Sequence, residues 1–338
     1  MKSKEIVRRA IEFDKPSRLP FFLGEHSDYI QQLVPMIPND IYDCWEMDRQ
    51  KNGWFFDNPT RDDWGCGWEA THINTIGQVK HHPLENYSKL DSYRPPNPRD
   101  PFYFERLDDY IDKAGDRYVM LTSHFNFFER FHMLRGFQQA LEDFYLEPEK
   151  CQKVLDMILE FKINNFDELN KRFGDRVNGI FLTDDWGTQK NTIVSEALFK
   201  EFFLERYKQL VDAVHSHNWH FILHTCGRVK EFIPFFIEVG IDVLNIQVQA
   251  NGIKDIGENF AGKICFLETA DIQNTLPKGN AELVRQEARE LVKYWSTPKG
   301  GFIVLDHSAD AEATGIPKEM DKVVFEEFWN LAYYWENK

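Results

Sequence analysis

Short apolar segments alternate with longer amphipathic segments from about residue 115 onward, and this alternation constrains the fold more than any other feature. A short apolar run bounded by turn residues is typical of a buried strand, whereas apolar residues three and four positions apart indicate a helix. Strands that alternate with helices form parallel sheets. We interpret seven segments as strands, at residues 19–26, 118–123, 177–187, 220–227, 242–249, 263–273 and 301–310.

Seven strands, with an eighth hidden in a weaker pattern, favour an α/β fold of the (β/α)8 TIM-barrel type for a chain of 338 residues. A doubly wound sheet is the alternative. No strand is followed by a GxGxxG or P-loop motif, so binding of nucleotide phosphates is unsupported. We expect residues 1–338 to form a single domain. Within it, residues 50–105 are rich in Trp, Asp, Pro and Gly and are expected to form an irregular insertion or hairpin cap over one barrel end.

The amphipathic segments predict the helices that connect these strands. Helical spacing of apolar residues is found at residues 147–173, 195–217, 229–240 and 280–295, and a last helix is expected at the C-terminus. Ser195 is of a residue type that caps helix N-termini.

The segment FILHTCG contains the most specific chemical signal. His224 and Cys226 are two positions apart, so in a strand both side chains point to the same face, and Gly227 lets the chain turn away. Imidazole and thiolate are a ligand pair that zinc prefers. A chance pair with a buried structural thiol is the alternative, because two ligands do not make a site.

Polar groups also follow the other predicted strands, and active sites of barrels lie at the carboxyl ends of strands. Because nearly every strand ends in such a group, the pattern strengthens the zinc interpretation. The groups are Glu25 and His26, Ser123 and His124, Thr183, Asp184 and Asp185, Asn245, Gln247 and Gln249, Glu268 and Asp271, and Asp306 and His307. Each has a structural alternative: an aspartate can cap a turn, the glutamines can be core amides, Glu268 can pair with a lysine, and His124 can pack in an aromatic cluster.

Composition narrows the function classes. A net charge of −15 argues against non-specific nucleic-acid binding and against anionic membranes. Five cysteines at irregular spacing form no disulfide framework, and no apolar run approaches the length of a membrane span. The charged N-terminus has no apolar core, so we expect no signal peptide and a cytoplasmic location. Some of the 29 Phe, 12 Tyr and 9 Trp must fill the core, and an excess beyond the core would line a pocket for a flat or apolar ligand.

Motifs along almost the whole chain resemble the uroporphyrinogen decarboxylase superfamily, and within it the cobamide-dependent methyltransferases. The motifs are RRAIEFDKPSRLP (8–20), DDWGCGW (62–68) with GQV and HHPL after it, FFERFHMLRGFQQAL (127–141), DDWGTQ (184–189), LHTCG (223–227), VGIDVLNIQ (239–247), DIQNTLP (271–277) and GGFIV (300–304). The resemblance implies a TIM barrel, and in the methyltransferase branch a zinc ion held by the His-x-Cys pair, here His224 and Cys226.

Two departures refine what the resemblance implies. The decarboxylase branch holds its substrate with an arginine-rich N-terminal segment, and residues 21–29 contain no arginine. Thiol-methylating members supply a second Cys from the last strand, and residues 303–317 contain none. We expect Asp306 to be the third zinc ligand, with His307, Glu268 or Gln247 as alternatives. A site with one thiolate is more Lewis acidic than a site with two, which suits an ether oxygen better than a thiol.

The resemblance therefore implies a zinc- and corrinoid-dependent methyltransferase of the O-demethylase type. It would move a methyl group from a methoxylated aromatic, or a similar small-molecule donor, to Co(I) of a separate corrinoid protein. Asp184, Asp185, Glu268 and His307 are the candidate catalytic residues. The candidate substrate-binding residues are His26, His124, Phe127, Trp186, Gln189 and Gln247, with Phe125 and Phe128 beside them. The alternatives are methyl transfer from a methylcorrinoid to a thiol and a metal-free decarboxylase. The acidic surface and aromatic insertion are compatible with a homodimer.

Overall fold

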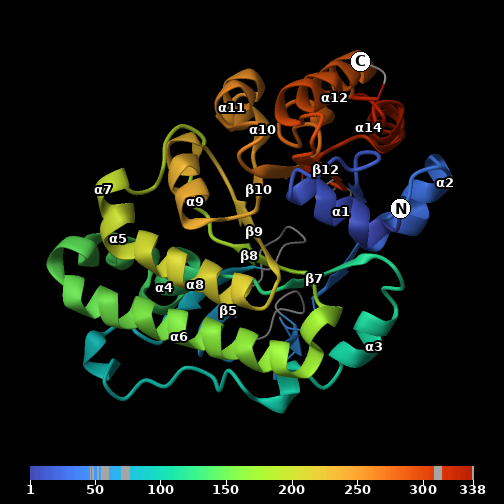
Figure 1. Ribbon diagram of the computed structural model, residues 1–338. Coiled ribbons are helices and arrows are strands. Elements are labelled where there is room, and N and C mark those ends of the chain that lie inside the picture. Colours follow the sequence, from blue (N-terminus) through green and yellow to red (C-terminus); the bar gives the residue numbers. More distant parts are fainter. Residues whose placement is uncertain are drawn as a thin grey trace.

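Eight parallel strands form one sheet that is nearly closed into a barrel (Figure 1). The computed structural model describes residues 1–45, 47, 49–51, 53–54, 61–69, 77–307 and 314–336. The sheet has the order β1-β12-β11-β10-β9-β8-β7-β2, so neighbours in space are neighbours along the chain. The strands are β1 (Phe21–Phe22), β2 (Ile41–Cys44), β7 (Tyr118–Thr122), β8 (Gly179–Thr183), β9 (His220–Thr225), β10 (Val243–Ile246), β11 (Cys265–Glu268) and β12 (Phe302–Leu305). The predicted TIM barrel is confirmed, because a doubly wound sheet would reverse its strand order.

The hidden eighth strand is β2, which pairs with β7 in the register Ile41 to Tyr118. Its four residues contain a tyrosine and an aspartate and therefore give no apolar run. The seam between β1 and β2 is held by the buried Asp40. Its carboxylate accepts a hydrogen bond from the backbone N–H of Phe21 (3.0 Å) and two from Arg18 (2.6 and 2.7 Å).

The connecting helices surround the sheet, and the long helices α6 and α8 lie side by side on one flank (Figure 1). The predicted helices are present, and the Oγ of Ser195 caps α7 by accepting from the N–H of Leu198 (3.2 Å). Among the described residues, no helix combines the length and the apolar character that crossing a lipid bilayer requires. The α-helices are α1 (Ser3–Ile11), α2 (Ser27–Leu33), α3 (Leu107–Asp112), α4 (Phe127–Arg135), α5 (Phe137–Leu146), α6 (Pro148–Phe173), α7 (Glu196–Phe199), α8 (Glu205–Ser216), α9 (Ile233–Val239), α10 (Val248–Asn251), α11 (Ile253–Phe260), α12 (Ala281–Trp295) and α14 (Glu319–Asn330).

Two clusters of buried apolar side chains form the core, and neither covers the carboxyl ends of the strands. The larger cluster lies between the strands and the helices. The smaller cluster joins inward-facing strand residues such as Met120, Ile222 and Leu267 to Val7 and Ile11 of α1. Helix α1 thus covers the amino ends of the strands, and the carboxyl ends remain for polar side chains.

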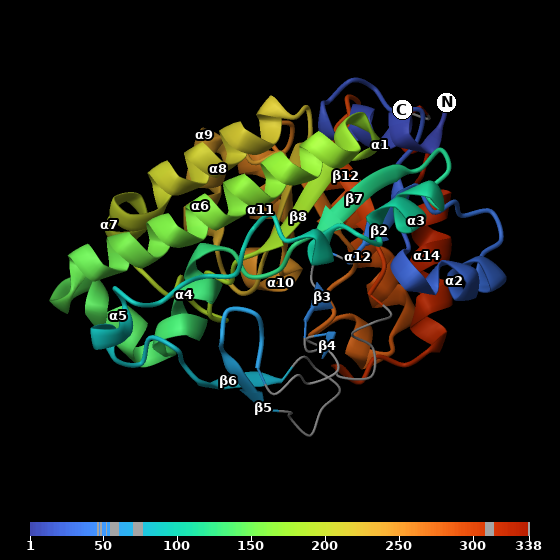
Figure 2. The same cartoon turned by 90° about the horizontal axis from the view of Figure 1, so that it is seen from below.

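The chain between β2 and β7 contains two antiparallel pairs, β3 (Arg49–Gln50) with β4 (Gly53–Trp54) and β5 (Gly67–Glu69) with β6 (Gln78–His81) (Figure 2). The ring of Trp68 lies 5.7 Å from that of Phe125, just after β7, so this region contacts the carboxyl end of the barrel. The predicted cap at 50–105 and the single-domain organisation stay predictions, because residues 52, 55–60 and 70–76 lie outside the described residues. Residues 308–310 of the last predicted strand lie outside them as well.

Candidate metal centre

Asp185, His224 and Cys226 converge at the carboxyl ends of β8 and β9. Their potential ligand atoms all lie within 4.8 Å of one another. His224 Nε2 is 3.3 Å from Cys226 Sγ and 3.7 Å from Asp185 Oδ1. The parallel register pairs Thr183 with His224, so the residues two positions further along each strand, Asp185 and Cys226, come side by side.

The two distances from His224 Nε2 are close to those between the ligands of a bound zinc ion. At zinc–nitrogen, zinc–sulfur and zinc–oxygen bonds of about 2.0–2.3 Å in a tetrahedron, ligand atoms lie about 3.3–3.6 Å apart. The side chains of His224 and Asp185 are 29% and 39% exposed, so a further ligand has access from solvent. A nitrogen, a sulfur and an oxygen with an open fourth position are the pattern of a catalytic zinc site.

Two glycines hold the loops after β8 and β9 in direct contact. A side chain on Gly227 would meet the backbone of Gly187 at 2.3 Å, and Gly227 also has a φ of +78°. Backbone hydrogen bonds join Gly187 N–H to the Cys226 carbonyl (3.0 Å) and Arg228 N–H to the Thr188 carbonyl (2.7 Å). The N–H of Cys226 also donates to Asp185 Oδ1 (2.8 Å). This contact brings the aspartate beside the His-x-Cys pair.

Asn245 and Glu268 determine which nitrogen of His224 faces the centre. The Asn245 amide nitrogen donates to the Leu267 carbonyl (2.8 Å) and to Glu268 Oε1 (2.6 Å), so its oxygen faces the histidine. His224 Nδ1–H therefore donates to Asn245 Oδ1 over 2.5 Å, and the lone pair of Nε2 points toward Cys226. Fixing the tautomer through the remote ring nitrogen is typical of metal-binding histidines.

Glu268, a predicted catalytic residue, contacts Asn245, and in the described part of the chain it is not a member of the converging ligand group. Burial raises the pKa of its carboxyl to about 8, although hydrogen bonds from the N–H groups of Ile246 and Thr269 oppose this shift. At neutral pH the group is mainly protonated. Its contacts make it a support for Asn245.

Asp184 and Asp185 have different environments although they are adjacent. Asp184 is fully buried, and burial raises the pKa of its carboxyl to about 7. It accepts hydrogen bonds from the Tyr207 hydroxyl (2.7 Å) and the Glu129 N–H (2.9 Å), which tie the loop to α8 and α4. Asp184 thus anchors the loop that presents Asp185.

Glu129 is a buried acid that reasoning from strand ends missed, since it lies on α4. Its Oε2 accepts from the Thr183 hydroxyl (2.6 Å). Burial, followed by the negative charges of Asp185 and Asp184, raises its carboxyl pKa well above the ordinary value. The sequence feature that could have pointed to Glu129 is its position in the motif FFERFH, which is among the motifs that carry the family resemblance.

Asp306 and His307 lie three strands away from His224 and have other partners. Asp306 Oδ2 is 3.1 Å from Nδ1 of His26. His307 is buried, contacts Asp321 of α14 (3.1 Å) and stacks on Phe325. Within the described part of the chain, the converging ligand group contains Asp185 in the place expected for Asp306.

Of the six predicted substrate-binding residues, His26 contacts Asp306, and the other five fall into three groups. Phe127 and Trp186 are fully buried in an aromatic cluster around Tyr207, so they support the site from the core and present no surface to a ligand. His124 follows β7 and its ring lies 4.9 Å from Trp45. Gln189 and Gln247 are accessible and hydrogen-bonded to each other (3.1 Å), linking the loops that follow β8 and β10 on either side of β9.

The family is shown by a sequence model described as Uroporphyrinogen decarboxylase (URO-D), which matches residues 63–311, well over half of the chain. The chain belongs to the uroporphyrinogen decarboxylase family. No curated protein sequence matches it significantly.

Solved structures match this chain at low sequence identity. A methyltransferase from Methanosarcina mazei is 15% identical, with a TM-score of 0.71 and coverage of 98% of this chain and 99% of that chain. Xylanase 10B from Thermotoga petrophila RKU-1 is 10% identical, with a TM-score of 0.48 and coverage of 98% of both chains. A mannanase from Cellulomonas fimi is 12% identical, with a TM-score of 0.46 and coverage of 99% of this chain and 74% of that chain. At 15% identity the likeness to the Methanosarcina mazei methyltransferase concerns the fold alone.

Proposed function

We propose that this protein is a zinc-dependent methyltransferase that moves a methyl group from an aryl methyl ether, or a similar donor, to Co(I) of a corrinoid carried by a partner protein. The convergence of Asp185, His224 and Cys226 carries the proposal. The family membership and the barrel shared with a methyltransferase from Methanosarcina mazei support it.

The donor set favours ether cleavage over thiol methylation. It contains one sulfur, one nitrogen and one carboxylate oxygen, and such a site is harder than one with two thiolates. When bound, zinc would act as a Lewis acid on the oxygen from which the methyl group departs.

The chain's own residues would position the reactants. Asn245 keeps Nε2 of His224 directed at the centre, and the paired loops hold Asp185 and Cys226 at the barrel mouth. Gln189 and Gln247 lie beside this mouth, where their amides can orient a donor or contact the docked corrinoid protein.

The proposal is tested by metal analysis and a methyl-transfer assay on the same samples. Wild type should contain about one zinc per chain and should methylate free cob(I)alamin with at least one methoxylated aromatic. Cys226→Ala should lose both properties, with activity reduced at least about a hundredfold because a Lewis acid contributes several kcal/mol. Cys265→Ala, which removes a buried thiol on β11, is the matched control and should keep both.

Three other outcomes would contradict the proposed reaction or indicate a different one. Full activity in metal-free wild type would contradict the proposal. Turnover that depends on an added thiol and methylcob(III)alamin would indicate the reverse methyl transfer. Metal-independent release of CO2 from a carboxylated ring would indicate a decarboxylase.

A further inference from the structure

Two apolar side chains, Phe181 and Leu305, keep partial exposure inside the barrel, and we refer to them as the barrel floor. Both pack against the smaller apolar cluster, whose buried members are at most 8% exposed. Phe181 lies on β8 and Leu305 on β12, four strands apart in the eight-stranded sheet. In a nearly closed barrel this separation places the two side chains on opposite sides, so together they span the interior.

The exposed surface of the barrel floor opens toward the carboxyl ends of the strands. Helix α1 covers the amino ends through Val7 and Ile11, and the strands themselves enclose the sides. The partial exposure of Phe181 and Leu305 therefore faces the barrel mouth, where the metal centre lies. An accessible apolar surface beside a few converging polar groups is typical of small-molecule sites.

Phe181 lies next to the metal centre, on its inner side. It pairs in register with Ile222, and His224 is the next residue on the same face of β9 as Ile222. The rings of Phe181 and His224 are 6.4 Å apart at an angle of 31°. A ligand that is held at the metal centre and extends into the barrel therefore meets the ring of Phe181.

The surroundings of the barrel floor favour an uncharged aromatic ring. Aromatic rings pack on phenylalanine in offset or edge-on arrangements, and a leucine on the other side adds apolar contact. Asp43 at the end of β2 is also partly exposed, and its carboxylate accepts from the Thr122 hydroxyl (2.7 Å). Thr122 pairs in register with Phe181, so this negative charge lies beside the floor and disfavours an anionic ligand.

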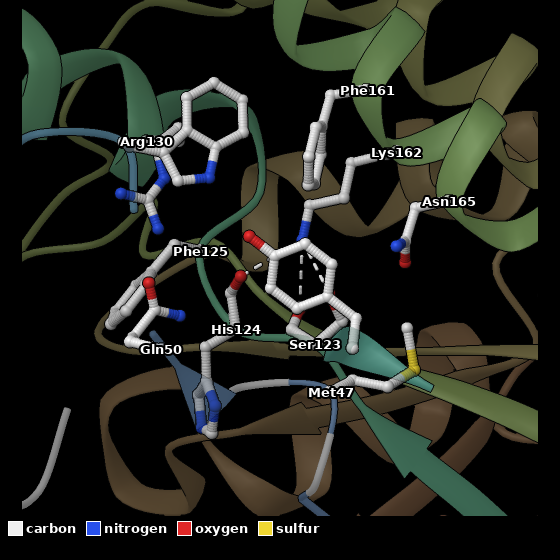
Figure 3. A pocket seen from close by; sticks show the side chains of 11 residues that line it. Met47, Gln50, Ser123, His124, Phe125, Arg130, Phe161, Lys162 and Asn165 are labelled. Atoms are coloured by element: carbon white, nitrogen blue, oxygen red, sulfur yellow. Dashed lines mark hydrogen bonds between the residues drawn. The ribbon is translucent and has the colours of Figure 1, made fainter. Parts of the chain in front are cut away.

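The small cavity between the end of β7 and α6 is not a site for such a ring (Figure 3). Its volume is about 40 Å³. Since one water needs roughly 10–15 Å³ on this measure, the cavity has room for about three waters and not for an aromatic ring. The Lys162 ammonium at its wall donates to Ser123 Oγ (2.9 Å) and to the carbonyls of Ser123 (3.2 Å) and His124 (3.0 Å), so its three N–H groups are used.

We propose that the barrel floor binds the uncharged aromatic ring of the ligand held at the metal centre, and that Phe181 is a specificity-determining residue. This substrate class, a neutral aromatic compound, rests on the proposed function and makes it more specific. It favours an aryl methyl ether over a carboxylated ring or a small thiol. The apolar contacts of the floor need no metal, so they can be measured on metal-free protein.

Calorimetric titration of chelator-treated full-length protein with phenol, benzoate and methanol at constant ionic strength tests the barrel floor. Phenol should bind saturably at one site, benzoate should bind more weakly, and methanol should show no saturable binding. Phe181→Ser should weaken phenol binding about tenfold, because the ring contact and its apolar surface are lost. Phe137→Ser removes a 49% exposed ring on α5, outside the barrel, and is the matched control that should bind phenol like wild type.

Added zinc distinguishes failure of the barrel floor from failure of the proposed function. Zinc should tighten phenol binding in wild type, because the hydroxyl oxygen can complete the metal centre, and should leave it unchanged in Cys226→Ala. If zinc has no effect while Phe181→Ser still weakens phenol binding, the floor is supported and the zinc-dependent reaction is not.

Leu305→Ser is a second variant, on the opposite side of the floor, and should also weaken phenol binding. Equal phenol affinities in wild type, Phe181→Ser and Leu305→Ser would contradict the proposal, as would benzoate bound as tightly as phenol. Should both variants fail to fold, wild type still decides, because equal binding of phenol and methanol, or no saturable binding of phenol, overturns it.

Discussion

The two sides of the barrel mouth contain similar residues and arrange them differently. After β8 and β9, Asp185, His224 and Cys226 bring their ligand atoms together and stay partly accessible. After β12, Asp306 contacts His26, and His307 turns outward to Asp321. A histidine or aspartate at a strand end is therefore not sufficient for a metal centre. Adjacent strands, matched register and a supporting hydrogen-bond network are also needed.

The largest effect is expected when Asp185 and Asp306 are replaced separately and the zinc affinities of the two variants are compared. Asp185→Asn should reduce zinc affinity strongly, because a neutral amide is a poor zinc ligand, whereas Asp306→Asn should keep about one zinc per chain. Competition titration with a chelating dye measures both affinities. Loss of zinc in Asp306→Asn with retention in Asp185→Asn would reverse the comparison and restore the assignment made from the sequence.

The next test concerns the buried acid behind the metal centre. The pKa of Glu268 is raised from an ordinary 4.5 to about 8, so the folded state binds the extra proton between these values. In metal-free protein, the contribution of this group should therefore lower the unfolding free energy by a few kcal/mol as pH rises from about 4.5 to 8. Glu268→Gln should flatten the profile in this window, as measured by urea unfolding. An unchanged slope would show that Glu268 is not held in its protonated form.

A smaller effect is expected for the residue that orients the histidine. Asn245→Leu should weaken zinc binding by about 10–100-fold, because the outer hydrogen bond that fixes the tautomer of His224 is lost. Asn245→Asp keeps an acceptor for Nδ1–H and should recover most of the affinity. Equal affinities in wild type and Asn245→Leu would mean that the two paired loops alone position the ligands.

The smallest effect is expected on the opposite side of the barrel. His307→Phe keeps the stacking on Phe325 and removes one hydrogen bond to Asp321, which still accepts from the Tyr29 hydroxyl. The unfolding free energy should fall by about 1 kcal/mol, with zinc content and methyl transfer unchanged. A loss of activity without a loss of stability would indicate that His307 takes part in the reaction after all.

The periodicity of the sequence was sufficient to predict the barrel and most of its helices. Short apolar runs such as residues 221–223, followed by turn residues, are typical of buried strands, and amphipathic runs such as 147–173 are typical of the helices that cover them. The short strand β2 was not apparent, because IYDC has no run of apolar residues and owes its pairing to Asp40 and β7. Local pattern therefore reveals long, strongly periodic elements better than short ones.

The His-x-Cys pair was equally visible in the sequence, since the two-residue period of a strand places both side chains on one face. The third member of the converging ligand group, Asp185, could not be identified from the sequence as the partner of this pair. Asp185 and Asp306 both follow apolar runs, and only the parallel register of β8 and β9, with the close approach of Gly187 and Gly227, brings Asp185 beside Cys226. Spacing along the chain thus determined the elements and the local pair. The tertiary structure decided which distant side chains join it, because that depends on strand order and loop contacts that no local pattern encodes.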